Sequence, residues 1–560
     1  PWLGKLEIGS TGTTSNGSTS NLLKLFGTLG LATAAVSSCV LHLQPELIKS
    51  LPFEFSPVYE QTVVLCITSL VVSTFYVVSI QSQLKRRIMN MPEVPPEIPV
   101  LGSIKSFLTN VPWDLMENWH KQYGGIYRYT LLGRTCVALA DPAHLRIVLQ
   151  SKIKHVKKDV DFAYKPFLPI LGKGIVTSEG KSWMRQRLSV SSVLRIDVLD
   201  EIPRITLGAV QRLCAKLDAA AESGEVIEMA EELRHLTLQV ISETFFSLPA
   251  EESNTTFAQM YLPIVEEGNK RVWHPERNFA FFLPFFWKHK AAVARLNNYV
   301  SKLIVERWEQ RRSEKVSNDS KRKEDVLDRI ISAYDKEDAP KWGKGVVNQL
   351  RDELKTFMLA GHETSAAMMT WALYELVSNE ELMATVTKEG ASVFGEDYDW
   401  CKDGVNGDYL PSREELGKLE LSEACLRESL RKYSVVPTVT RKAVENIQVG
   451  SHTIPKGSTI MINIQAVHHD AKLWPDPMKF DPTRFCDPSP QPKPYTFIPF
   501  IEGPRNCLGQ YLALLESKMV LSMLLQRYSF TLQGGGEPRH PYMVPVIPKT
   551  GVFVTVKRKF

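Results

Sequence analysis

Residues 500–509 read FIEGPRNCLG and place Cys507 in a loop rich in glycine and proline. Gly503 lets the backbone turn tightly, because glycine lacks the Cβ atom that restricts other residues. An apolar stretch with helical character, 508–525, follows the cysteine directly, and the positive end of its helix dipole would stabilise a thiolate. A lone cysteine in such a loop is ordinarily a buried structural residue. The residues alone therefore predict either a structural thiol or an activated thiolate at Cys507.

The same residues fill every fixed position of the pattern Phe-x-x-Gly-x-Arg-x-Cys-x-Gly, and they resemble the haem-binding signature of cytochrome P-450 enzymes. Matches at all of these spaced positions weigh against a structural thiol. The resemblance implies haem b (iron protoporphyrin IX), with the Cys507 thiolate as the axial ligand that favours O–O bond cleavage. It places Phe500, Gly503 and Gly509 at the cofactor, where a glycine lets the backbone approach the flat macrocycle. Arg505 would reach a haem propionate with its guanidinium.

A second motif lies in segment 344–379, whose apolar residues occupy more than one face and therefore predict a long buried helix. Residues 360–365 read AGHETS and resemble the oxygen-activation motif of the same family. The Thr364 hydroxyl can bond the carbonyl of Ala360 and bend the helix, although a helical threonine is usually just a satisfied hydroxyl. The resemblance implies that Thr364 holds a ligand or a water above the iron while Glu363 relays protons from solvent.

Positions near these motifs complete the distal side of the expected site. His362 lies two residues from Thr364 and points to another helix face, so packing or hydrogen bonding is expected of it rather than iron binding. An apolar substrate pocket is expected from four residues close to the motifs: Phe357, Ala360, Val436 and Val439.

Two further charged sets stand at spacings that the family also shows. Glu428 and Arg431 share one helical face at i, i+3, which alone is a routine exposed pair. Residues 477–485 read PMKFDPTRF and resemble the family element that contains Arg484. The resemblance implies a buried charge triad of Glu428, Arg431 and Arg484 that fixes the cysteine loop. Such a triad is structural, since losing one member strands a buried charge.

Trp183 and Arg187 also share one helical face, at i, i+4, and Arg441 lies further along the chain. The resemblance assigns all three to contacts with the haem propionates. Without the resemblance, each of these arginines would be interpreted as part of a surface ion pair.

Composition is that of an ordinary globular chain, with 44% hydrophobic and 23% charged residues among 560. The net charge of +5 is spread along the chain without a sustained basic stripe, which argues against a nucleic-acid partner. The eight cysteines include no Cys-x-x-Cys pair, so a reducing compartment is expected rather than a disulfide framework.

The N-terminal region has its own composition. Residues 1–21 are rich in Gly, Ser and Thr with one acid, Glu7, which is typical of a flexible leader or a transit-peptide remnant. Residues 22–90 form a hydrophobic region, and its uncharged stretch 62–80 is close to the ~20 residues that a membrane-spanning helix needs. A buried core helix is the alternative, but no amphipathic pattern supports it.

Three basic residues directly after this stretch place the later chain on the cytoplasmic or stromal side: Lys85, Arg86 and Arg87. A second uncharged stretch, 25–41, leaves a single and a double span both open. The expected location is the endoplasmic reticulum membrane with the catalytic domain in the cytoplasm, and the alternative is a chloroplast membrane.

Residues 91–102 read MPEVPPEIPVLG and predict a stiff extended hinge, because proline fixes φ and disfavours helix before it. From 103 to 560 one catalytic domain is expected. The resemblance implies a mainly α cytochrome P-450 fold with a smaller β region and an N-terminal membrane anchor.

The function implied is a haem-thiolate monooxygenase that inserts one oxygen atom from O2 into an apolar lipid, sterol, terpenoid or carotenoid. No strand-linked Gly-x-Gly-x-x-Gly unit is present in the sequence, so electrons are expected from an NADPH-dependent reductase or a ferredoxin. Two alternatives remain open: a haem-thiolate isomerase or dehydratase of hydroperoxides, and a non-catalytic haem sensor or electron carrier.

Overall fold

The computed structural model describes residues 89–193, 199–278, 281–317, 324–332, 341–396, 410–486, 491–537, 539–540 and 543–559. Contacts divide the chain into two units, 1–90 and 91–560, and the elements of the second unit are those given below. The leader at 1–21 and the anchor expected at 62–80 lie outside the described residues. Among the helices that the structure does describe, none combines the length and the apolar character needed to span a bilayer.

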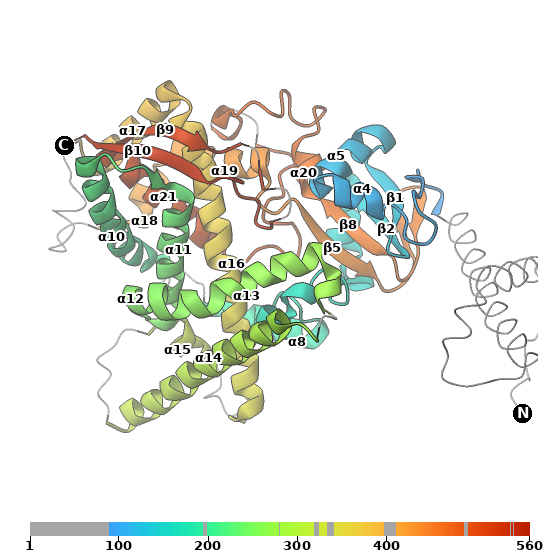
Figure 1. Cartoon of the computed structure of the whole chain (residues 1–560), viewed down its shortest axis with the longest axis horizontal. Coiled ribbons are helices and arrows are strands. Elements are labelled where there is room, and N and C mark those ends of the chain that lie inside the picture. Colours follow the sequence, from blue (N-terminus) through green and yellow to red (C-terminus); the bar gives the residue numbers. More distant parts are fainter. Residues whose placement is uncertain are drawn as a thin grey trace, which may run out of the picture. The chain divides into compact units, whose positions relative to one another are not determined.

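The second unit is mainly helical with a smaller sheet region, which confirms the mainly α fold with a smaller β region that the sequence predicts (Figure 1). The helices are α4 (Ile104–Thr109), α5 (Pro112–Tyr123), α6 (Pro142–Arg146), α7 (Leu168–Leu171), α8 (Gly180–Val193), α10 (Ile202–Ser223), α11 (Met229–Phe246), α12 (Ala250–Glu252), α13 (Ala258–Trp273), α14 (Pro284–Ser317), α15 (Val326–Ser332), α16 (Lys344–Val377), α17 (Glu380–Phe394), α18 (Arg413–Gly417), α19 (Glu420–Tyr433), α20 (Ile464–His468) and α21 (Gln510–Arg527). The strands are β1 (Ile126–Leu131), β2 (Arg134–Leu139), β3 (Val156–Lys157), β4 (Ile227–Glu228), β5 (Thr438–Ala443), β6 (Ile447–Val449), β7 (His452–Ile454), β8 (Thr459–Asn463), β9 (Tyr528–Gly535) and β10 (Val552–Arg558).

The largest sheet has the strand order β1-β2-β8-β5-β3 and is antiparallel except where β2 runs parallel to β8. Its first hairpin turns through Leu132 and Gly133, at φ 51° and 73°, a left-handed conformation that glycine adopts without strain. Strand β5 pairs Val439 with Ile462 and Arg441 with Ile460, so the sheet fixes where both predicted site residues stand. Smaller sheets join β4-β10-β9 and β6-β7.

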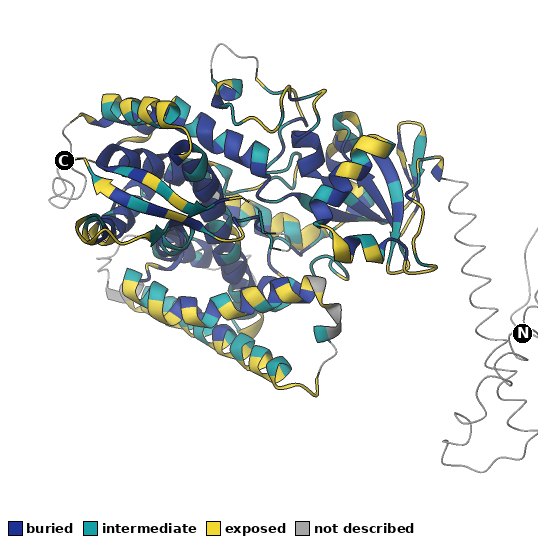
Figure 2. Ribbon diagram, turned by 45° about the horizontal axis from the view of Figure 1, so that its top comes forward, coloured by how far each residue is buried: buried dark blue, intermediate teal, exposed yellow. Residues whose placement is uncertain are grey.

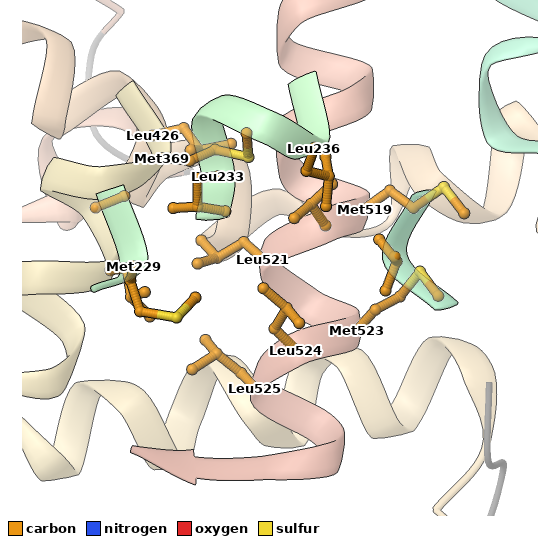
Figure 3. Packing of buried hydrophobic residues seen from close by; sticks show 14 of the residues in the cluster. Met229, Leu233, Leu236, Met369, Leu426, Met519, Leu521, Met523, Leu524 and Leu525 are labelled. Carbon is orange, nitrogen blue, oxygen red and sulfur yellow. The ribbon is translucent and has the colours of Figure 1, made fainter. Parts of the chain in front are cut away.

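The helical core forms around α16 and α21, which are buried along most of their length, whereas α13 and α14 alternate exposed and covered positions (Figure 2). Figure 3 shows α21 surrounded by apolar side chains, with Met229, Leu233 and Leu236 from α11 on its flanks. Each fully buried leucine of this kind contributes ~1.5–3 kcal/mol. This packing explains why the stretch 508–525 is apolar on more than one face, and it holds α21 in a fixed place.

The segment predicted as a hinge, 91–102, lies along the edge of β1. The Val94 amide donates to Arg128 O at 2.9 Å, and the Arg128 amide donates to Pro92 O at 2.9 Å. The Val94 side chain is buried. The extended conformation that the prolines favour therefore packs against the sheet as an additional short edge.

Candidate functional site

The cysteine loop is closed by its own backbone. The Cys507 amide donates to Phe500 O at 2.8 Å, and the Asn506 amide donates to Gly503 O at 3.0 Å. Gly503 has φ +80°, and a Cβ atom there would lie 2.4 Å from Leu149 O. Glycine is therefore required at this turn, both for its conformation and for the close approach of the two backbones.

The Cys507 side chain is exposed even though protein surrounds it. Burial raises the pKa of the thiol above its ordinary value, while the amides of Gly509 and Gln510 and the Arg187 guanidinium act in the opposite direction. The two amides belong to the start of α21, so the helix N-terminus faces the sulfur, as the sequence predicts. A Cβ atom on Gly509 would meet no protein atom within 4 Å, so the space beside Gly509, two residues after Cys507, is open.

The predicted residues of α8 contact the same loop. Arg187 Nη1 donates to Asn506 O at 2.6 Å, and Arg187 Nη2 donates to Asn506 Oδ1. The Arg505 guanidinium lies 4.2 Å from the centre of the Trp183 ring. Arg505 Nη1 donates to Ser178 O at 3.0 Å, and Nη2 pairs with the Glu179 carboxylate. Trp183, Arg187 and Arg505 thus form one cluster beside Cys507.

Arg441 lies in a neighbouring cluster. Its other members, Lys158 and Tyr164, are not predicted from the sequence. Arg441 is buried in β5, its guanidinium donates to Thr440 O at 2.8 Å, and it hydrogen-bonds Tyr164. Lys158 Nζ lies 3.3 Å from the Tyr164 hydroxyl, and the Lys158 amide donates to Glu179 Oε1 at 2.6 Å. Burial first, and then the charges of Arg441 and Arg505, lower the pKa of Lys158 well below its ordinary value.

These two clusters hold more basic than acidic side chains, of which Arg441 is buried and Lys158 and Arg505 are partly buried. Three basic side chains (Lys158, Arg441 and Arg505) act on one another, and one carboxylate, Glu179, lies among them. Crowded buried cations cost free energy unless anions compensate them. The clusters therefore suit a ligand that brings negative charge.

On the other side of the site, α16 carries the predicted oxygen-activation motif. The Thr364 hydroxyl donates to Ala360 O at 2.7 Å. Ala360 is exposed and Thr364 is partly exposed, although most residues in this half of α16 are buried. Gly361 faces α11, where a Cβ atom would lie 2.5 Å from Ile241 Cδ1. Close packing on one side of α16 thus leaves accessible surface at Ala360 and Thr364.

Glu363 points away from solvent and is paired. Its carboxylate Oε1 lies 3.1 Å from His362 Nε2 and 3.8 Å from Arg234 Nη1 of α11. Burial would raise the pKa of Glu363, but the hydrogen bond and charge of His362 and the charge of Arg234 outweigh it, so the pKa is lowered. His362 is fully buried, and its ring packs edge-on against Tyr261 at 5.4 Å.

The predicted pocket residues differ in accessibility. Phe357 is buried and its ring lies 5.1 Å from that of Phe245, so it contributes little open surface. Ala360 is exposed, and Val436 and Val439 are partly buried. Among these four residues, Ala360 is therefore the most exposed relative to its size.

The predicted triad residues lie together. Arg431 Nε donates to Glu428 Oε2 at 2.7 Å and Arg431 Nη2 donates to Glu428 Oε1 at 2.8 Å, a bidentate pair with both side chains fully buried. Arg484 Nε lies 3.4 Å from Glu428 Oε1. The backbone amide of Asp481 also donates to that oxygen, at 2.9 Å.

A chain of hydrogen bonds leads from the triad toward the cysteine loop. Arg431 Nη1 donates to His468 O at 2.9 Å, and His468 Nε2 accepts the Ile498 amide at 3.0 Å. Ile498 lies two residues before Phe500, whose carbonyl closes the loop around Cys507. The triad is therefore connected to the loop through α20.

Haem is a flat macrocycle with two propionates, and the observed geometry fits it. An exposed cysteine faced by helix amides can ligate its iron, and the surplus of basic side chains can neutralise its propionates.

Comparisons with known proteins agree with this geometry. A family model described as Cytochrome P450 matches residues 92–556. The chain is 29% identical over 464 residues to Cytochrome P450 4c21 of Blattella germanica, covering 80% of this chain and 88% of that protein. It is 28% identical over 464 residues to Protein LUTEIN DEFICIENT 5, chloroplastic, of Arabidopsis thaliana (79% and 73% covered). It is 30% identical over 394 residues to a Cytokinin hydroxylase of the same plant (69% and 72% covered).

Proposed function

The chain belongs to the cytochrome P450 family, as a haem-thiolate monooxygenase, and we propose that it inserts one oxygen atom from O2 into an apolar small molecule with Cys507 as its iron ligand. The observation that carries the proposal is the exposed Cys507 at the start of α21, with the basic side chains of Arg187 and Arg505 beside its loop. When bound, the haem supplies the iron chemistry that activates dioxygen.

Residues on the cysteine side of the site would hold the haem and its ligand in place. The amides of Gly509 and Gln510 would stabilise the thiolate of Cys507 when it ligates the haem iron. The clusters around Arg505 and Arg441 would hold the propionates of the haem, and the triad around Glu428 would keep the cysteine loop in position.

Thr364 and Glu363 of α16 deliver protons on the side of the site opposite the cysteine loop. The Thr364 hydroxyl sits on an accessible stretch of α16, where it can hold a water molecule close to the reacting oxygen. Glu363 is the adjacent acid. It pairs with Arg234, whose side chain is more exposed to solvent than that of Glu363. An alcohol beside an acid is suited to the protons that dioxygen cleavage consumes.

The substrate class follows from apolar positions and from the names of relatives. Ala360, Val436 and Val439 are apolar and are not fully buried, which favours an apolar guest such as a lipid, sterol, terpenoid or carotenoid. The name of one relative refers to lutein, which agrees with a carotenoid. Electrons would come from an NADPH-dependent reductase or a ferredoxin.

We place the enzyme at a membrane through residues 62–80, either at the endoplasmic reticulum or in a chloroplast. The uncharged composition of that stretch and the word chloroplastic in the name of one relative support these two locations. Fractionation of cells that express the whole chain with a tag tests the proposal, and recovery in a soluble fraction would contradict it.

The test of function is a substrate screen on the purified holoprotein. We expect a shift of the haem Soret band with β-carotene, lauric acid or cholesterol, and NADPH-dependent oxidation of the one that binds when a reductase is added. Product formed under labelled O2 should carry one labelled oxygen atom. Turnover of a hydroperoxide without NADPH would instead indicate the isomerase or dehydratase alternative.

Replacing Thr364 by alanine should uncouple electron use from product. The product formed per NADPH should fall about tenfold, equivalent to ~1.4 kcal/mol, while NADPH oxidation continues and peroxide is released. Thr364→Ser keeps a hydroxyl and should remain coupled. Thr370→Ala is a matched control, because Thr370 makes the same kind of bond six residues later in α16, to Ala366 O at 2.8 Å. Full coupling in Thr364→Ala would refute the role.

Replacing Lys158 by methionine should weaken haem binding, because it removes one of the cations that face the propionates. The affinity should fall about tenfold, measured as the rate and extent of haem transfer to a scavenger protein. Lys157→Met is the control, since Lys157 is the exposed neighbour in β3. Equal haem retention in the two variants would exclude Lys158 from the propionate site.

A further inference from the structure

Segment 169–174, called the strap below, lies on α16, where charged side chains of that helix hold its backbone. Lys355 Nζ donates to Pro169 O at 3.0 Å, and Asp352 Oδ2 accepts the Lys173 amide at 3.0 Å. Both contacts use backbone atoms of the strap. Its position on α16 therefore does not depend on the identity of its own side chains.

The strap lies so close to α16 that two of its positions require glycine. A Cβ atom on Gly172 would lie 2.2 Å from Asp352 Cγ, and one on Gly174 would lie 2.3 Å from Thr356 Oγ1. A larger residue at either position would push the strap away from the helix. The Thr356 hydroxyl also lies 3.3 Å from Leu171 O, which it can reach with a weak hydrogen bond. Steric fit and hydrogen bonds thus place the strap on the same turns of α16.

The two charges that hold the strap are buried, since Asp352 is 8% exposed and Lys355 is 1% exposed. Their charged atoms lie 3.5 Å apart, and Asn297 Oδ1 of α14 accepts a further Lys355 hydrogen at 2.7 Å. Burial, which acts against the charge of Asp352, lowers the pKa of Lys355 to about 8. Apolar side chains of similar size are often no less stable than a buried ion pair, so stability alone gives little reason for these charges. The place that they give to the strap explains them better.

The residues under the strap continue directly into the accessible part of α16. Four residues stand at successive i, i+4 positions, so each neighbours the next on the helix surface: Asp352, Thr356, Ala360 and Thr364. The first two contact the strap and are buried, whereas Ala360 is exposed and Thr364 is partly exposed. The strap therefore ends where the accessible surface of the site begins.

Beyond the strap, the chain runs to the cysteine side of the site. Ser178 O accepts Arg505 Nη1 of the cysteine loop at 3.0 Å. Only residues 175–177 separate this contact from the strap. One end of the segment is thus fixed on α16 beside Ala360 and the other end at the cysteine loop, so the segment forms one side of the site.

We propose that Asp352 and Lys355 are positioning residues that set the width of the substrate site, a role that rests on the proposed monooxygenase function. They fix the strap as a wall beside Ala360. A broad, rigid guest with fused rings has to displace this wall and break its bonds to α16, whereas a slim hydrocarbon chain does not. Selection against broad guests therefore comes from the free energy of these bonds.

Two variants weaken the bonds from the side of α16. Lys355→Met keeps the length of the side chain but removes the donor to Pro169 O. Asp352→Asn is the milder change, because it keeps the shape and only weakens the charge-assisted bond to the Lys173 amide.

A third variant acts from the strap, and a fourth is the matched control. Gly174→Ala leaves α16 unchanged and adds a methyl group that collides with Thr356. Lys518→Met removes a buried lysine of α21 that pairs with Glu423 of α19 at 2.9 Å, away from the strap.

The first measurement needs neither substrate nor turnover. In full-length holoprotein, the Lys173 amide should exchange its hydrogen with solvent about tenfold faster in Lys355→Met and in Gly174→Ala than in the wild type. The increase should be smaller in Asp352→Asn and absent in Lys518→Met. Amides of α21 in the same samples should keep their rates, which separates local release of the strap from general loss of stability. An unchanged Lys173 rate in both Lys355→Met and Gly174→Ala would overturn the proposal.

The second measurement compares a slim guest, lauric acid, with a broad guest, cholesterol, by titrating the shift of the haem Soret band. In Lys355→Met, the affinity for cholesterol relative to that for lauric acid should rise about tenfold over the wild-type ratio. Lys518→Met should keep the wild-type ratio. A variant that has only lost stability would bind both guests less well in equal proportion, and that result in Lys355→Met would overturn the proposal.

The behaviour of the wild type keeps this proposal apart from the proposed function. If the wild type oxidises apolar guests but the affinity ratio stays unchanged in Lys355→Met, the proposed function stands and the role of Lys355 fails. If the wild type binds no apolar guest, the proposed function fails and the role in substrate selection fails with it.

Discussion

Cys507→Ser should lose the haem-thiolate spectrum and lower reductase-supported turnover on the order of a thousandfold or more, about 4 kcal/mol of barrier. The reason is chemical, since a serine hydroxyl stays protonated and cannot supply the electron density that a thiolate donates to iron. Serine can still accept the amides of Gly509 and Gln510, so the loop should keep its conformation. Absorption spectra of the reduced carbon monoxide complex, recorded with haem content, check the first part.

Cys486→Ser is the matched control for that variant. Cys486 is partly buried and donates to Pro482 O at 3.6 Å, outside the loop that carries Cys507. Its replacement should leave spectrum and turnover unchanged. A wild-type spectrum in Cys507→Ser would show that another residue ligates the iron and would remove the basis of the proposed function.

How much of this site the sequence predicts depends on whether a pattern is local. The Cys507 loop and the α16 motif are short runs with fixed spacing, so residues 500–509 and 360–365 indicate them directly. The partner of Glu428 on its own helix follows from i, i+3 spacing, but Arg484 is reached only through the resemblance, because it lies far along the chain. The helical boundaries of α16 and α21 come close to the predicted ones, since both are apolar on more than one face.

What the sequence misses are single residues brought in by tertiary packing. Lys158 and Tyr164 belong to no motif in the sequence. They become candidate site residues only in the fold, where Arg441 of β5 lies beside them. The contact between His362 and Glu363 is also hidden, because adjacent residues on a helix do not normally face each other. Here Arg234 of α11 and burial against Tyr261 turn the two side chains together.

Arg431→Met should destabilise the protein by about 3–5 kcal/mol, because it strands the Glu428 carboxylate in a fully buried place. It also leaves His468 O and Lys479 O without the donors that Arg431 supplies at 2.9 Å and 3.2 Å. Because His468 supports the backbone before the cysteine loop, haem retention should fall together with stability. Denaturant midpoints and haem content, measured on the same samples, check both effects.

A matched control and a double variant decide whether the lost charge compensation is the cause. Arg204→Met removes an i, i+3 pair of the same spacing with Glu201, 3.2 Å apart but 57% exposed at the arginine, and should cost no more than about 1 kcal/mol. Glu428→Leu combined with Arg431→Met removes the stranded carboxylate and should regain part of the stability, because apolar replacement of a buried pair is often tolerated. The recovery stays incomplete, since Arg484 and the Asp481 amide then lose their acceptor. A double variant as unstable as Arg431→Met would instead assign the loss to packing, and the triad would no longer explain how the Cys507 loop is held.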